Sequence, residues 1–160
     1  MRYMWNILFF LTVLMVSMPA SAAGELKNYE ESLEKWRRSG IENYRIKVEY
    51  RSFGPLSGIW ELEVRNGMVE SFSFNGSTDK KYSGAAAQFT MESIYRRGVP
   101  SVETGRKIPM IVKTGFDSTN GYIKSVRRIR NPEFAGKVKE TGFIINIIEL
   151  KPYIPGGENR

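Results

Sequence analysis

The side chains that could do acid–base chemistry in this sequence are carboxylates, because the chain contains no histidine and no cysteine. A histidine base, a cysteine nucleophile and the usual ligands of zinc, copper, haem and iron–sulfur sites are therefore missing. Paired carboxylates hydrolyse glycosides when they flank a cleft and lie roughly 5–9.5 Å apart. Glutamates occur on neighbouring predicted strands at Glu49, Glu61, Glu63 and Glu70. Alternating glutamate also keeps a sheet face solvated, and we expect that role. A carboxylate-based hydrolase is the alternative.

The loop around Asp117 is the second place where oxygen ligands gather. Phe116-Asp117-Ser118-Thr119 partly resembles an aspartic-protease triplet, but its glycine is displaced to Gly121 and no second copy exists. Such a protease needs two carboxylates that share a proton. The same loop lacks the fuller acidic pattern of a calcium site. We therefore expect Asp117 and Asn120 to make turn hydrogen bonds, and we predict no metal site and no cofactor.

The densest basic cluster is Arg127-Arg128-Ile129-Arg130. Strict strand alternation places four side chains on one face, which makes them the candidate ligand contacts: Tyr122, Lys124, Arg128 and Arg130. A basic and aromatic strip of this kind suits anionic lipid or polysaccharide. The alternative is a solvated strand face with cross-strand partners such as Glu149.

Two helices and six strands are predicted to position these residues. Residues 25–38 have apolar side chains at helical spacing, and Gly40 follows as a left-handed cap. Residues 44–50 alternate as a half-buried strand, and residues 59–65 and 68–74 flank Asn66-Gly67, the preferred pair of a type I′ hairpin turn. In-register pairing would oppose Glu63 and Glu70, so we predict a bulge near Glu70–Ser71.

The second part of the chain repeats this order. A polar loop is predicted at 75–84, followed by a short helix with Thr90 as its N-cap and Gly98 at its end. Strands are predicted at 108–114, 122–130 and 141–150, and the last of them is expected to be central or covered on both sides because it is apolar on both faces. The shared order allows an ancient duplication, but common helix-ending residues are the better explanation of the short sequence match.

These elements predict one α+β domain in which two helices pack on a mainly antiparallel sheet of about six strands, in the order helix, three strands, helix, three strands. The domain is expected at residues 23–151, with a flexible tail at 152–160. The predicted core comprises Leu33, Trp36, Ile41, Tyr44, Ile46, Val48, Trp60, Leu62, Val64, Val112, Ile145 and Ile147.

Residues 1–22 have the features of a secretory signal peptide. Arg2 precedes a short apolar stretch, Pro19 interrupts it, and Ala20-Ser21-Ala22 matches a small-x-small cleavage site. We expect cleavage after Ala22 and a periplasmic or secreted product, with an uncleaved membrane anchor as the alternative. The chain carries a net charge of +7, which favours anionic envelope surfaces and also keeps a small domain soluble.

Three segments together resemble a family of exported bacterial proteins that is known only as a domain of unknown function, DUF6174. They are Trp36 with Ser39-Gly40-Ile41 and Asn43-Tyr44, then Val64 to Val69, then Phe116-Asp117 through Gly121-Tyr122. Some relatives carry cysteines soon after the first strand, and this chain has none. The resemblance implies no activity and transfers no functional residue.

The sequence predicts an exported bacterial protein that is not an enzyme and acts as a binding or interaction module of the cell envelope. Its partner is expected to be an envelope protein, an anionic lipid or a glycan. Nucleic acid is not expected because the protein is exported, and cleavage would leave no stable transmembrane segment.

Overall fold

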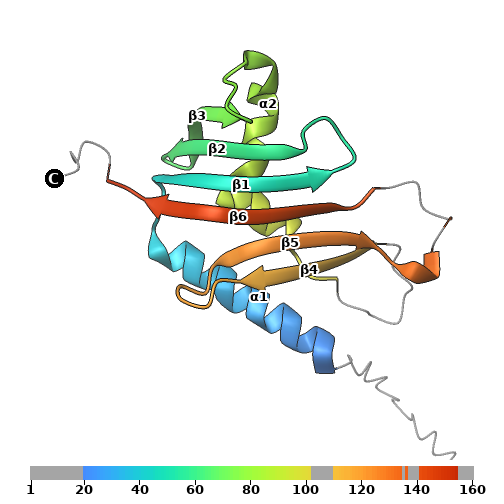
Figure 1. Cartoon of the computed structure of the whole chain (residues 1–160). Helices are drawn as coiled ribbons and strands as arrows, with labels where there is room; N and C mark the ends of the chain where they lie inside the picture. Colours follow the sequence, from blue (N-terminus) through green and yellow to red (C-terminus); the bar gives the residue numbers. More distant parts are fainter. Residues whose placement is uncertain (1–19, 102–109, 135, 137–140, 155–160) are drawn as a thin grey trace, which may run out of the picture.

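The computed structural model describes residues 20–101, 110–134, 136 and 141–154, with side chains from Gly24 onward. These residues form one antiparallel sheet, and every described helix lies on the same face of it, which leaves the opposite face without a helix from the described ranges (Figure 1). The strand order is β3-β2-β1-β6-β5-β4. The elements are α1 (Ala20–Ser39), β1 (Tyr44–Ser52), β2 (Gly58–Arg65), β3 (Met68–Phe74), α2 (Ser83–Ala86), α3 (Met91–Arg97), β4 (Met110–Phe116), β5 (Ile123–Arg130) and β6 (Phe143–Pro152).

The fold class is confirmed in outline and corrected in one respect. A mixed fold with a six-stranded antiparallel sheet is present, but the described residues contain three α-helices, two of them between the strand triplets. The predicted loop at 75–84 is partly helical, with a 3₁₀ turn at Lys80–Tyr82 that leads into α2. Asp79 starts this turn by accepting a hydrogen bond from the Lys81 N–H, and Tyr82 packs against Trp60 and Phe74.

Helix α1 begins at Ala20, within the predicted cleavage site, and ends at Ser39. Tyr29 and Trp36 are buried on its apolar face, and Leu33 between them is half-buried. Gly40 follows at a φ of 62°, the left-handed conformation expected of a helix cap. None of the helices in the described ranges combines the length and apolar character needed to cross a bilayer.

The hairpin between β2 and β3 forms as predicted. Asn66 and Gly67 both have positive φ, and Val64 pairs with Val69 while Glu63 pairs with Ser71. Glu70 is therefore the extra residue of a bulge, which places Phe72 and Phe74 opposite Leu62 and Trp60. Glu70 turns back to Arg65, with 2.9 Å between its Oε1 and the arginine Nη1.

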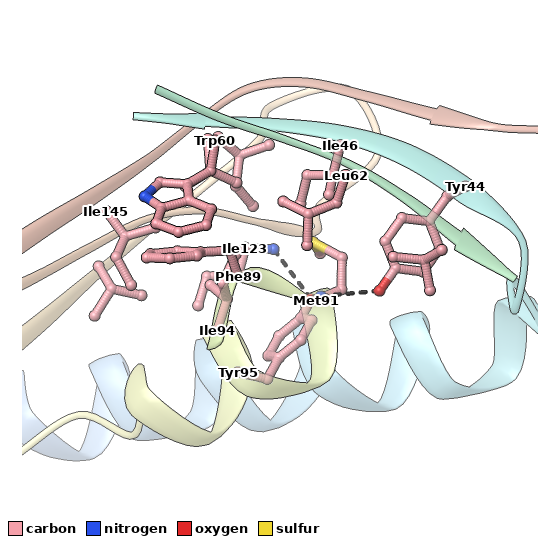
Figure 2. Packing of buried hydrophobic residues seen from close by; sticks show 14 of the residues in the cluster. Tyr44, Ile46, Trp60, Leu62, Phe89, Met91, Ile94, Tyr95, Ile123 and Ile145 are labelled. Carbon is pink, nitrogen blue, oxygen red and sulfur yellow. Dashed lines mark hydrogen bonds between the residues drawn. The ribbon is translucent and has the colours of Figure 1, made fainter. Parts of the chain in front are cut away.

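The core lies between the sheet and the helices (Figure 2). Trp60 stacks between Phe74 and Phe89, with ring centroids 4.6 Å from each. Nine of the twelve predicted core residues are buried, and the other three, Leu33, Ile41 and Val112, are half-buried. The prediction left out the buried side chains of α3 and of the turn before it: Ala86, Phe89, Met91, Ile94 and Tyr95.

A buried polar network attaches α3 to the sheet and to α1. The Tyr44 hydroxyl donates to Glu92 at 3.0 Å and accepts from the Met91 N–H at 3.0 Å. The pKa of Tyr44 lies far above its ordinary value, mainly because the hydroxyl is buried and secondly because Glu92 is negatively charged. The Tyr95 hydroxyl lies 2.8 Å from Ser32 Oγ and accepts from the Ile123 N–H. These hydrogen bonds are directional, so they fix the position of α3 on the sheet more specifically than apolar packing does.

Strand β6 is central, as predicted, but only one of its faces is covered. It extends to Pro152, and the Tyr153 N–H donates to the Asn43 carbonyl at 3.1 Å. The first residues of the predicted tail therefore belong to the sheet, while residues 155–160 lie outside the described part. Ile148 is a bulged residue opposite β1 and is 54% exposed.

Candidate functional site

A bulge in β5 decides where the four predicted contact residues lie. Val126 pairs with Thr114 and Ile123 pairs with Phe116, so Lys124 is the extra residue between them. The bulge shifts the alternation by one residue, and both Ile123 and Val126 consequently face the core. One continuous strip from Tyr122 to Arg130 does not form.

Tyr122 and Lys124 lie at the start of β5, where each contacts a neighbouring element of the fold. The Tyr122 ring meets the Trp36 ring edge-on, with centroids 5.2 Å apart. Lys124 Nζ lies 3.5 Å from Asp117 Oδ2 in the preceding turn. That turn is built as predicted, because Asp117 Oδ1 accepts from the N–H groups of Thr119 and Asn120. These backbone hydrogen bonds lower the pKa of Asp117.

Arg128 and Arg130 lie at the opposite end of β5, on the face of the sheet that carries the helices. They stand across from Val112 and Met110, whose side chains pack toward the core. Both arginines line a pocket of about 700 Å³ between the ends of β1, β5 and β6. We call it the strand-end pocket.

The strand-end pocket combines positive charge with an apolar lining. Three arginines from two strands line it: Arg128, Arg130 and Arg51, the last of which is also paired with Glu49. Its apolar side chains are Phe53, Ile129, Phe143 and Ile144. Phe53 is 92% exposed and adds to the apolar surface formed by the other three side chains. The pocket can therefore hold an apolar group beside an anionic one.

Gly142 lets the strands close around the pocket. A Cβ atom at Gly142 would overlap with the carbonyl oxygen of Arg128, so only glycine allows β5 to approach the start of β6 this closely. Phe143 follows directly and pairs with Arg128 across the two strands. The lining thus depends on a close backbone contact as well as on its side chains.

Helix α3 contributes a further cation, Arg97, which contacts the pocket residue Phe143. The Arg97 guanidinium lies over the rings of Phe143, Tyr50 and Phe89, at 4.3, 5.3 and 5.9 Å from their centroids. These distances are typical of cation–π contacts. Along the chain, Arg97 is simply the basic residue directly before Gly98 at the end of the predicted helix. No pattern along the chain indicated that it would lie against Phe143, because the two meet only in the folded sheet.

The glutamates that could have formed a hydrolytic pair each lie beside a cation instead. Glu61 is 2.6 Å from Lys47 and Glu63 is 3.7 Å from Arg45. Glu49 lies 2.6 Å from Arg51, and its pKa is lowered first by a hydrogen bond from Asn146. The Lys47 hydrogen bond likewise lowers the pKa of Glu61. A glycosidase acid needs a raised pKa, so this arrangement favours the solvated-sheet interpretation of Glu49 and Glu61.

Glu149, predicted as a possible partner of the β5 arginines, pairs elsewhere. Its Oε1 lies 2.6 Å from Lys151 Nζ, and its strand position is opposite Lys47. Within the part of the chain that the structure describes, no three acidic side chains gather closely enough to hold a metal ion.

A second pocket of about 550 Å³ lies between α1 and α3. One of its two carboxylates, Glu92, accepts hydrogen bonds from Trp36 Nε1 at 3.2 Å and from Tyr44, and the other is Glu42. Arg37 and Arg96 also line this pocket. Because Glu92 links α3 to α1 and β1, its role in the packing of the helices explains its position.

The comparisons with known proteins identify a family but no activity. A model of a family of unknown function (DUF6174) matches residues 28–127, which cover α1 through most of β5. Searches of curated proteins and of solved structures found no match.

Proposed function

We propose that this chain, which belongs to the DUF6174 family of unknown function, is a non-enzymatic binding module of the bacterial cell envelope. The features of residues 1–22 support export, since they match a secretory signal peptide. Its binding site is the strand-end pocket, and its ligand carries an anionic group and an apolar part.

One observation carries this proposal: three arginines and four large apolar side chains converge on a single pocket. Ligand pockets are mostly apolar, with a few polar groups that set orientation. Arginine suits phosphate and carboxylate because its planar fork can donate two parallel hydrogen bonds. Arg51, Arg128 and Arg130 supply the positive charge, while Phe143 and Ile144 supply the apolar surface.

The apolar lining favours a lipid over a polysaccharide. A sugar chain presents many hydroxyl groups, and each one buried without a hydrogen-bond partner costs free energy. Besides the arginines, only the hydroxyl side chains of Ser52 and Thr141 in the lining could bond a sugar, whereas Phe53 and Phe143 can cover an acyl chain. An anionic single-chain lipid matches both the charge and the surface of the pocket.

The test uses lysophosphatidylglycerol, a single-chain anionic lipid, below its micelle concentration. The exported protein should bind it, as measured by calorimetry, and should bind lysophosphatidylcholine more weakly because that headgroup has no net charge. The double variant Phe53→Ser/Arg130→Gln should lose about tenfold or more in affinity, because a hydrogen bond to a charged group is worth about 1.5–3 kcal/mol.

A matched control lies at the other end of the same sheet. Arg65→Gln/Met68→Ser removes one exposed cation and one exposed apolar side chain beside the β2–β3 turn. This control should bind the lipid as the wild type does. Equal loss in both double variants, or no binding of the lipid by the wild type, would contradict the proposal. Preferential binding of an acidic polysaccharide would show the other ligand class to be right.

A further inference from the structure

The outer face of the sheet, which carries no helix, pairs its charges in the first half. Arg45 stands directly opposite Glu63, and Lys47 stands directly opposite Glu61. Their charged atoms lie 3.7 and 2.6 Å apart. Opposite charges at facing positions stabilise an antiparallel pair of strands. In this half of the face, each of these charges is therefore paired with an opposite charge on the neighbouring strand.

The outer face of β4 and β5 is arranged in the opposite way. Lys113 stands directly opposite Arg127, and both side chains are exposed. Neither forms an ion pair with any residue in the described ranges. Like charges at facing positions repel and destabilise the strand pair. An external anion between the two side chains would remove this cost.

Apolar side chains lie on one side of this pair of cations along the strands, and Gly115 faces Ser125 on the other. Ile111 stands opposite Ile129 one pair along the same face, and Ile144 of β6 lies beside Arg127. Ile129 is 36% exposed, and Ile111 and Ile144 are half-buried. Strands β4 and β5 contain no acidic residue that could repel an anionic surface.

We propose that Lys113, Arg127, Ile111 and Ile129 form a docking surface for an anionic lipid bilayer. The two cations contact lipid phosphates, and the isoleucines reach the boundary between headgroups and acyl chains. Surfaces of this composition bind membranes through apolar burial combined with attraction to anionic lipids. The inference depends on the proposed function only in placing the protein at the envelope. It concerns the open sheet face. Ile129 also lines the strand-end pocket, so the two surfaces adjoin, but they use different cations.

Flotation with vesicles tests the docking surface. The exported protein should float with vesicles of equal parts phosphatidylglycerol and phosphatidylcholine, and should not float with phosphatidylcholine alone. High salt should weaken the interaction because salt screens exposed charges. Lys113→Gln/Arg127→Gln should weaken it about thirtyfold, since each basic residue near such a surface contributes about 1 kcal/mol. The substitution removes a repulsion, so the variant should fold.

A charge-matched control separates a local surface from net charge. Lys80→Gln/Arg96→Gln removes two exposed cations outside the open sheet face and should float as the wild type does. Flotation of Lys113→Gln/Arg127→Gln at wild-type strength would overturn the inference, as would equal loss in both double variants. Binding to dextran sulfate without binding to the vesicles would also overturn it, in favour of a soluble polyanion.

The same variants distinguish this inference from the proposed function. Phe53→Ser/Arg130→Gln should lose affinity for lysophosphatidylglycerol and should still float with the anionic vesicles. Lys113→Gln/Arg127→Gln should bind lysophosphatidylglycerol and fail to float. A protein that floats but binds no single-chain lipid supports the docking surface alone, and the reverse result supports the pocket alone.

Discussion

The two halves of the sheet differ in how their charged side chains are paired. Strands β1 to β3 carry four basic and four acidic residues, whereas β4 and β5 carry five basic residues and no acidic one. The first half forms cross-strand ion pairs, and the second places Lys113 opposite Arg127. A fold that can pair charges in one half and leaves like charges facing in the other keeps the second half available for an anionic partner.

The core beneath the two halves differs as well. Under the first half, Trp60 stacks between two aromatic rings, those of Phe74 and Phe89. In β4 and β5 themselves, the buried side chains are Met110, Ile123 and Val126, none of which is aromatic. Large stacked rings concentrate stabilisation at few positions, so the first half should be the more sensitive to a single substitution.

The largest expected effect is on that aromatic stack. Trp60→Ala removes a fully buried ring from between Phe74 and Phe89 and should lower the free energy of unfolding by about 3–5 kcal/mol. Urea unfolding followed by circular dichroism measures this loss. Val126→Ala, the matched truncation under the second half, should cost less. An equal cost at both positions would mean that the two halves of the core contribute alike.

A smaller effect is expected where the second half depends on close backbone packing. Gly142→Ala forces a methyl group against the Arg128 carbonyl and should destabilise the protein by about 1–3 kcal/mol. It should also weaken lysophosphatidylglycerol binding, because β5 and β6 separate at the pocket. Gly67→Ala is the control away from the pocket, since no atom lies near its missing Cβ and only its positive φ is strained. Unchanged lipid binding in Gly142→Ala would contradict this role.

Introducing an opposite-charge pair in the second half and a like-charge pair in the first half should change the stability of the protein in opposite directions. Lys113→Glu creates an opposite-charge pair with Arg127 and should stabilise the protein by about 0.2–1 kcal/mol. Glu61→Lys sets like charges opposite Lys47 and should destabilise it by a similar amount. Midpoints of urea unfolding at low salt measure both. A destabilised Lys113→Glu variant would contradict the repulsion argument, whatever its effect on vesicle flotation.

The smallest expected effect is a difference in acid sensitivity. Lys47 lowers the pKa of Glu61 below its ordinary value of 4.5, so the Glu61 carboxylate contributes stability above that pH. This contribution is lost as the pH falls through the lowered pKa. Glu61→Gln should therefore lose less stability on acidification than the wild type does. Lys113→Gln should follow the wild-type profile, and parallel profiles in all three proteins would contradict the assignment.

The fold was predictable from local patterns in the first half and less so in the second. Asn66-Gly67 determines a two-residue turn, and that turn brings Glu63 and Glu70 into conflict unless a bulge intervenes, so the bulge could be inferred. The bulge at Lys124 produces no comparable conflict along the chain. It arises because both Ile123 and Val126 are buried under the helices, which the strand sequence does not indicate.

The helical segment shows the same limit of local patterns. Thr90 was identifiable as an N-cap because capping residues act within one turn. The burial of Met91 and Tyr95 depends on Tyr44 and Ser32, which are distant along the chain. Their places in the core could not be assigned without the packing of α1 and α3 on the sheet.

The sequence by itself determined the absence of histidine and cysteine, the hairpin and the antiparallel strands, because composition and short-range periodicity control these features. Export is a prediction from the same kind of pattern. Only the tertiary structure decided that Arg128 and Arg130 join Arg51 at a pocket, while Tyr122 and Lys124 belong to a turn. The physical reason is that one bulged residue reverses the face of every later side chain on its strand, and long-range burial selects where that residue lies.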